Sequence, residues 1–453
     1  MQNLTDELKI YELSKIWKEA EYNFAFWDKV DIDWDSEYKK ALSRILKTTD
    51  IYEYYKELSR FISLLNDGHT FVGYPVSVMQ DVNYFSMLPI YVFPFEDGIF
   101  VLNVTENFKD KIPLYSRLKK VNGIDVYEYL RENCYPYIWH ANEESCSISA
   151  VNELIYGRLG TSDSFTFEKD NEEFEIALER VDPTKVTWAV TGAVRHNKYE
   201  NKLICKSDTA KVYMTDENIA VIKIISFVDG SLPQKVFDCF DDIKNAKGYI
   251  IDLRANGGGN SEFANDIASM FIKGDIKNAP FETQRYEPAF KAWAVYRDDF
   301  DGVTKEEYKS RFSDAESQKA YEMSKNISYV SYEGEAFSSN APGKLEGKVV
   351  ILANANTASA AEDFIDTMRF YTNATLIGTN TAGTTGEPLY QNLESGGFFK
   401  ICTCRCDAQN GEDVYNKGFA PDIKVGSKLT DFISGDDPAL KKAIELINKS
   451  SAE

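Results

Sequence analysis

Histidine is scarce in this chain: only His69, His140 and His196 occur among 453 residues, so a reaction that needs a proton acceptor near neutral pH has few candidates. Long hydrophobic runs are absent as well. No stretch approaches the roughly 18 apolar residues of a transmembrane helix, and Met1–Glu7 lacks the basic and apolar parts of a signal peptide. We therefore expect no membrane insertion. The location expected for the chain as given is cytoplasmic, or extracytoplasmic if a signal was trimmed from it.

Basic side chains are outnumbered. Lys and Arg total 51 against 72 Asp and Glu, which gives a net charge of −21. A surface this negative repels the phosphate backbone of nucleic acids and the headgroups of anionic lipids. We therefore expect no nucleic acid among the partners of this chain.

Paired cysteines are also missing. Seven cysteines without paired spacing fit reduced thiols in a cytosol-like compartment. Cys402, Cys404 and Cys406 would share one face of a strand, but a metal or redox site would need their close convergence and, for a metal, a fourth ligand, and none lies nearby in the sequence. We expect buried or half-buried strand residues there, and no metal or other cofactor.

An apolar strand, Val349–Ala353, leads into a helix-forming segment through Asn356-Thr-Ala-Ser-Ala-Ala-Glu362. This places Ser359 at a helix N-terminus, where unpaired N–H groups and the helix dipole would stabilise an oxyanion beside its hydroxyl. The pattern favours Ser359 as an acyl-transfer nucleophile. The alternative is structural: Ser is a preferred N-cap, and Glu362 would complete a capping box.

Three successive glycines, Gly257 to Gly259, follow a second apolar strand, Gly248–Arg254, and precede a helix expected from about Glu262 to Ile272. A turn without side chains can adopt positive φ angles and present a backbone N–H at close range to a ligand. The segment lacks the Gly-x-Gly-x-x-Gly and Gly-Lys-Ser/Thr spacings of phosphate-binding loops. The alternative is a tight strand-to-helix turn without a ligand.

His69 lies in Leu64-Leu-Asn-Asp-Gly-His-Thr70, a polar turn after the apolar segment Leu58–Leu65. A serine nucleophile needs a base, and histidine has the unperturbed pKa closest to neutrality. His140 and His196 do not lie in a comparable polar turn after an apolar segment, so His69 is the candidate base. The alternative is a structural or surface histidine.

In this order and spacing, the three motifs resemble those of the C-terminal-processing, or tail-specific, serine peptidase family, in particular its tricorn-core and interphotoreceptor retinoid-binding protein-like branch. The likeness extends through Leu376–Gly386 and through Gly418–Val425, which is similar to the family's G-x-x-P-D-I ending. It implies an α/β fold with a layered β-β-α (ClpP/crotonase-like) catalytic core, an N-terminal helical unit and a PDZ-like β-rich domain. It also implies that the N–H groups of Ala360 and Gly258 form the oxyanion hole.

The chain departs from the family's pattern at two positions. Many members use a Ser-Lys dyad, but Thr384 stands at the lysine position and no Lys lies between Ser359 and Lys400. The tricorn-like branch uses a His instead, and His69 matches it. Tyr415 replaces the Glu of that branch's E-N-x-G run. The group that orients His69 therefore stays open between the backbone and four carboxylates: Asp67, Glu387, Glu412 and Asp413.

The length suggests about three folded units, and 43% hydrophobic residues are ample for their cores. Periodicity indicates an N-terminal helical unit (1–76), a β-rich part (77–182), an α/β core (183–430) and a C-terminal helical segment (431–453) whose helix opens at Pro438. The resemblance implies that the β-rich part is a PDZ-like domain and that the α/β part is the serine peptidase core. The aromatic, acidic stretch 286–332 would be a lid or a solvated surface helix. One helical stripe is expected at Ile10, Leu13, Trp17, Ala20 and Phe24.

The function that these patterns and the resemblance imply is a serine peptidase. It would hydrolyse peptide bonds in peptides or protein C-termini through an acyl-enzyme on Ser359, with His69 as general base. The expected partner is a peptide or protein substrate; its sequence, and whether the chain is a monomer or a homo-oligomer, stay open. The alternative is a non-catalytic protein that binds peptides or lipophilic ligands on the same scaffold.

Overall fold

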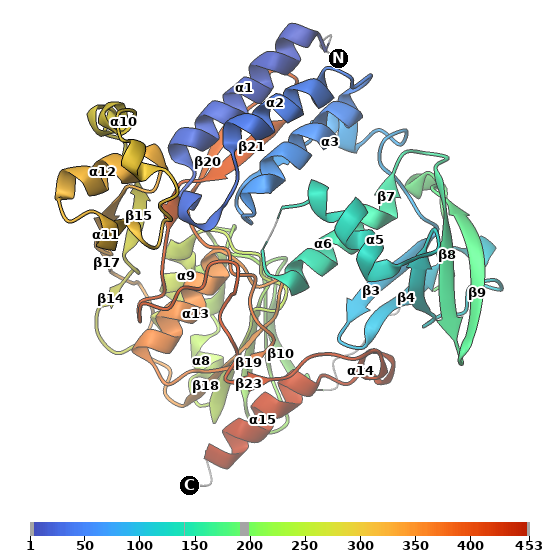
Figure 1. Cartoon of the computed structure of the whole chain (residues 1–453). Helices are drawn as coiled ribbons and strands as arrows, with labels where there is room; N and C mark the ends of the chain where they lie inside the picture. Colours follow the sequence, from blue (N-terminus) through green and yellow to red (C-terminus); the bar gives the residue numbers. More distant parts are fainter. Residues whose placement is uncertain (1–3, 140, 191–198, 451–453) are drawn as a thin grey trace. The chain divides into compact units, whose positions relative to one another are not determined.

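A computed structural model describes residues 4–139, 141–190 and 199–450 (Figure 1). His140 and His196 lie outside these residues. No helix in the described part is long and apolar enough to cross a membrane. The contacts divide the chain into two units, each built from three segments: Met1–Val78, Pro280–Gly334 and Gly386–Asp407 in the first, and Met79–Ala279, Glu335–Thr385 and Ala408–Glu453 in the second.

A seven-stranded sheet forms the centre of the second unit, in the order β10-β11-β12-β13-β18-β19-β23. Its first three strands pair antiparallel, and β12 onwards pairs in parallel. The strands are β10 (Lys202–Lys206), β11 (Ala210–Met214), β12 (Ala220–Ile224), β13 (Gly248–Asp252), β18 (Lys348–Ala353), β19 (Thr375–Gly378) and β23 (Ile423–Lys424).

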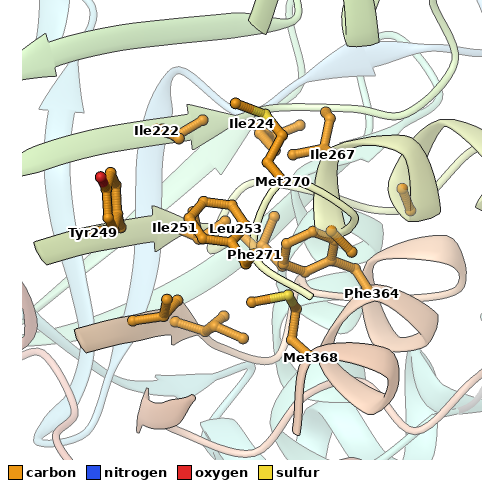
Figure 2. Packing of buried hydrophobic residues seen from close by; sticks show 14 of the residues in the cluster. Ile222, Ile224, Tyr249, Ile251, Leu253, Ile267, Met270, Phe271, Phe364 and Met368 are labelled. Atoms are coloured by element: carbon orange, nitrogen blue, oxygen red, sulfur yellow. The ribbon is translucent and has the colours of Figure 1, made fainter. Parts of the chain in front are cut away.

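Helices bury both faces of this sheet, because side chains alternate along a strand. On one face Ile251 shares a core with Phe364 and Met368 of α13 (Ala360–Tyr371) and with residues of α9 (Ser261–Ala268), as Figure 2 shows. On the other face Ile250 packs with residues of α15 (Pro438–Ser450). Strands buried on both faces read as continuous apolar runs, which is why the sequence predicted this α/β core correctly.

A second sheet in this unit has the order β3-β4-β5-β8-β9, with β6 paired to β5. Its core also contains residues of two helices, α5 and α6, which the alternating sequence pattern did not indicate. The part is β-rich, as predicted, while its PDZ likeness stays a prediction. Its elements are β2 (Ser86–Met87), β3 (Ile90–Phe95), β4 (Gly98–Val104), β5 (Arg117–Val121), β6 (Ile124–Asp125), α5 (Val126–Asn133), α6 (Glu143–Ile155), β7 (Tyr156–Gly157), β8 (Ser162–Lys169) and β9 (Glu172–Glu179).

Short elements complete the second unit. Two of them, β14 and β17, pair antiparallel, and α7 and α8 pack against the central sheet. The elements are η3 (Glu106–Phe108), η4 (Tyr135–Tyr137), η5 (Pro183–Lys185), α7 (Leu232–Phe237), α8 (Phe240–Ile243), β14 (Ile276–Lys277), β17 (Ala336–Phe337) and α14 (Leu429–Ser434).

The first unit combines N-terminal helices with two three-stranded sheets, β1-β21-β20 and β16-β15-β22. The stretch 286–332 contributes three α-helices, the 3-10 helix η6 and strand β16, so the interpretation as one solvated surface helix is wrong. The elements are α1 (Asp6–Asn23), η1 (Trp27–Lys29), α2 (Trp34–Ile45), α3 (Ile51–Ile62), η2 (Ser63–Leu65), β1 (Phe71–Gly73), β15 (Phe281–Gln284), α10 (Pro288–Ala294), η6 (Asp298–Phe300), α11 (Tyr308–Arg311), α12 (Ala315–Ser324), β16 (Tyr329–Tyr332), β20 (Pro388–Asn392), β21 (Phe398–Cys402) and β22 (Cys404–Arg405); α4 (Val76–Met79) lies where the two units join along the chain.

The buried stripe of α1 differs from the expected one. Leu13, Ala20 and Phe24 are fully buried, but Ile10 is 38% exposed. A carboxylate takes part in the buried face instead: Glu12 is fully buried and accepts hydrogen bonds from the Tyr54 hydroxyl at 2.9 Å and from Ser395 N–H at 2.7 Å. Hydrophobic periodicity did not predict the burial of Glu12, because the residues that donate to its carboxylate lie far away in the sequence.

Candidate active site

Ser359 lies between β18 and α13, as the sequence predicts, but its backbone is not helical. Its φ of 56° and ψ of −131° belong to a region that L-residues rarely adopt, at a cost of about 1–3 kcal/mol. Its N–H donates to the Thr384 carbonyl at 2.8 Å, and its own carbonyl accepts the N–H groups of Glu362 and Asp363. A strained serine on a sharp strand-to-helix turn is the arrangement of a nucleophile elbow.

The capping-box interpretation is wrong. The Ser359 side chain makes no capping hydrogen bond, and the Glu362 carboxylate is buried, where it accepts hydrogen bonds from the Thr381 hydroxyl and from the N–H groups of Gly383 and Thr384. Burial raises the pKa of Glu362 to about 7, against the opposing effect of these hydrogen bonds. Thr384 contacts both residues, so Glu362 braces the segment that accepts the Ser359 N–H.

The triple-glycine turn lies directly against Ser359. A Cβ on Gly258 would be 2.6 Å from Ser359 Cβ and 3.1 Å from Ser359 Oγ, and Gly258 has a φ of +105°. Both the space and the backbone conformation therefore require glycine. Gly257, in contrast, has open space around it. Two motifs that are far apart in the sequence thus meet within one unit.

Asn256 links these two turns, and the sequence analysis missed it. Its carbonyl accepts the Ala358 N–H at 3.1 Å, and its Oδ1 accepts the Gly258 N–H at 2.9 Å. The side chain is fully buried, and its Nδ2 has no hydrogen-bond partner within the described part of the chain. The only sequence signal was a polar residue before three glycines.

The two expected oxyanion donors differ in their surroundings. The Gly258 N–H donates a hydrogen bond to Asn256 Oδ1. Its donation to a substrate oxyanion therefore stays a prediction. Ala360 is the first residue of α13, a position whose N–H has no partner inside a helix. The start of α13 therefore offers a donor next to Ser359.

His69 lies in the first unit, in the turn between η2 and β1. Asn66 adopts the left-handed conformation, and Asp67 Oδ2 accepts the His69 backbone N–H at 3.0 Å, which closes the turn. Burial, and to a smaller extent the Lys400 charge, lowers the pKa of His69 to about 4. The imidazole is therefore neutral at pH 7, the state that a general base requires.

The four candidate acids have different surroundings. Asp67 is buried, which raises its pKa to about 6, and it contacts His69 through the backbone N–H. Asp413 forms a salt bridge with Lys417 at 2.9 Å. Glu387 and Glu412 are exposed. The identity of the group that orients the His69 ring therefore stays open.

The structure brings Ser359, Gly258 and Ala360 together in the second unit and describes His69 in the first. The pairing of Ser359 with His69 therefore stays a prediction. Thr384, at the position of the lysine in Ser-Lys enzymes, is buried and uses its N–H and carbonyl to join Glu362 to Ser359.

The three clustered cysteines lie in the first unit, and one of them, Cys402, contacts the residue that follows His69. Cys402 is buried at the end of β21, and its N–H donates to Thr70 Oγ1 at 3.0 Å; Cys404 and Cys406 are half-buried. Within the residues that the structure describes, no group of three or more His, Cys, Asp or Glu side chains could hold a metal ion.

Comparison with curated proteins points to one family. The family model for peptidase family S41 matches residues 218–425. The carboxy-terminal processing protease CtpA of Bacillus subtilis (strain 168) is 26% identical over 223 residues, which cover 48% of this chain and 37% of that protein. A probable CtpA-like serine protease of Staphylococcus haemolyticus (strain JCSC1435) is 23% identical over 290 residues, or 63% of this chain and 45% of that protein. The chain spans less than half the length of these relatives.

Solved structures support the fold. Mature CPAF aligns with a TM-score of 0.66 at 16% identity, over 99% of this chain and 97% of that one. A putative peptidase from Parabacteroides merdae ATCC 43184 aligns with a TM-score of 0.51 at 18% identity, over 98% and 97% of the two chains. At such identities the likeness concerns the fold alone. Residues 218–425 of this chain match the model of peptidase family S41, in agreement with the resemblance of its motifs to the C-terminal-processing serine peptidases.

Proposed function

We propose that this chain is a serine peptidase that hydrolyses peptide bonds in peptides or protein C-termini through an acyl-enzyme on Ser359. The observation that carries the proposal is the strained Ser359 backbone at the start of α13, held against Gly258. A serine that only capped the helix would need neither the strain nor the glycine contact. The match of residues 218–425 to peptidase family S41 supports the peptide bond as the substrate class.

In the proposed reaction Ser359 Oγ attacks the carbonyl carbon of the scissile bond, and His69 takes the hydroxyl proton. The Ala360 N–H and an N–H of the triple-glycine turn stabilise the oxyanion. His69 then returns the proton to the leaving amine, and water hydrolyses the acyl-enzyme by the same steps. The lowered pKa of His69 keeps its ring unprotonated before the attack.

Labelling with a fluorophosphonate, read by intact mass, tests this proposal. We expect one adduct on the wild-type chain, none on Ser359→Ala, and strongly slowed labelling of His69→Gln, together with loss of cleavage of an unfolded, dye-labelled protein. His196→Gln is the matched control for the histidine change and should label normally. A folded wild-type chain that neither labels nor cleaves would overturn the proposal in favour of a binding protein on this scaffold.

A further inference from the structure

Two thiols, Cys205 and Cys239, meet in the second unit although 33 residues lie between them in the sequence. Cys205 lies on β10, and Cys239 lies at the corner between α7 and α8. Their sulfur atoms contact the same acceptor, the Lys235 carbonyl, with Sγ–O distances of 3.9 Å and 3.3 Å. The neighbouring Cys205 thiol also contributes to the raised pKa of Cys239.

The backbone at Cys205 is adapted to this contact. Strand β10 is the edge of the seven-stranded sheet, and its register with β11 shifts between Leu203 and Cys205. Such an irregularity bends a strand and redirects a side chain. Cys205 packs against the same hydrophobic core that contains Cys239, so both thiols point toward the α7 side of the sheet.

Solvent reaches the pair through a surface hollow of about 310 Å³, lined by both thiols and by Lys206, Lys235 and Asp238 among others. Cys205 is half-buried and Cys239 is only 3% exposed. A metal site is not favoured here, since the described residues contain no group of three ligands. Two adjacent thiols, one of them accessible, are instead the requirement for disulfide chemistry.

We propose that Cys205 and Cys239 form an intrachain disulfide when the chain meets a low-molecular-weight disulfide such as glutathione disulfide. The Cys205 thiolate attacks one glutathione sulfur, and the first glutathione leaves as a thiol. Cys239 then loses its proton and attacks Cys205 Sγ, which releases the second glutathione. Two electrons pass from the protein thiols to glutathione disulfide, and two reduced glutathiones result.

The bond would link edge strand β10 to the α7–α8 corner. The disulfide would join positions that are 34 apart in the sequence. Such a cross-link lowers the conformational entropy of the unfolded chain and should raise the Tm by roughly 3–5 °C. Burial is the main cause that raises the pKa of Cys239 to about 12, and the neighbouring Cys205 adds to it. Only the thiolate of Cys239 attacks Cys205 Sγ. The rate of disulfide closure should therefore rise about tenfold for each unit of increasing pH near neutrality. This modification is independent of the proposed peptidase activity.

The test is oxidation of the purified full chain with glutathione disulfide, beside a sample kept in reductant. We expect five of the seven thiols to remain, a cross-linked peptide pair containing Cys205 and Cys239 in an unreduced digest, and the higher Tm. Cys205→Ser and Cys239→Ser should lose the cross-link and the Tm rise, whereas Cys404→Ser, from the other thiol cluster, should keep both.

Three results would overturn this proposal: glutathione held on Cys205 without closure, a cross-link among other cysteines in place of this one, or seven free thiols after prolonged exposure. The digest of the wild-type chain decides among them even if a serine variant fails to fold.

Discussion

Replacing Glu362 by Gln tests whether the buried carboxylate positions Ser359, the proposed nucleophile. Glu362 Oε1 accepts from Thr381 and Gly383, and Oε2 accepts the Thr384 N–H. Gln replaces one of these oxygens by an NH₂ donor, so a buried N–H loses its acceptor at a cost of about 1–3 kcal/mol. Because the Thr384 carbonyl holds the Ser359 N–H at 2.8 Å, we expect kcat to fall about 10- to 100-fold with little change in KM.

The same substitution has a pH signature. Burial raises the Glu362 pKa from 4.5 to about 7, so between these values the folded chain binds the proton more tightly than the unfolded chain. The carboxyl therefore stabilises the fold fully below pH 4.5, and this contribution is lost as the pH rises through 7. The shift corresponds to about 3 kcal/mol. The free energy of unfolding of the wild type, measured relative to Glu362→Gln, should fall by that amount across this window.

Urea unfolding at about pH 5 and about pH 8, with fluorophosphonate labelling rates and peptide hydrolysis, measures both effects. Glu445→Gln, on the exposed face of α15, is the control and should behave like the wild type in every assay. A Glu362→Gln variant with wild-type kcat, and with a stability difference that does not change with pH, would refute the bracing role of Glu362.

Two further predictions follow from the site. Gly258→Ala places a Cβ 2.6 Å from Ser359 Cβ at a φ of +105°. We therefore expect a loss of at least about 1–3 kcal/mol of stability and a fluorophosphonate labelling rate reduced more than about 100-fold. Gly257→Ala, whose Cβ meets open space, should change stability and labelling little, and equal effects of the two changes would contradict the packing. The His69 pKa of about 4 predicts that kcat/KM loses activity only below about pH 5, and a pH profile with its acid limb near 6.5 would contradict the lowered pKa.

Local sequence patterns were sufficient to predict the elements that flank Ser359. The apolar run Val349–Ala353 is buried on both faces, and the segment after Ser359 is the helix α13, so position and type were both predictable. The role of Glu362 was not, because a capping box is a local signature while its actual partners lie about 20 residues further on. Tertiary hydrogen bonds from buried N–H groups outweighed the local alternative.

The same limit applies to Asn256 and to the thiol pair. Nothing in the sequence around Asn256 shows that its carbonyl and side chain would bind two different turns. Cys205 and Cys239 lack a recognisable spacing, since the bulge in β10 and the α7–α8 corner determine their meeting. Sequence patterns selected Ser359 and His69 as candidate catalytic residues, whereas the contacts around them depend on the fold.

The strain at Ser359 leads to a last prediction. Its φ of 56° and ψ of −131° mirror an ordinary extended conformation, so glycine adopts them without strain while Ala shares the strain of Ser. Ser359→Gly should therefore be more stable than Ser359→Ala by about 1 kcal/mol, although glycine loses more chain entropy on folding, and both variants should lack the fluorophosphonate adduct. If Ser359→Gly unfolds at lower urea concentration than Ser359→Ala, the backbone at this position is not strained. If it is the more stable variant, the fold maintains a costly conformation at Ser359, as expected for a position where the chemistry of the hydroxyl, and not its packing, determines the geometry.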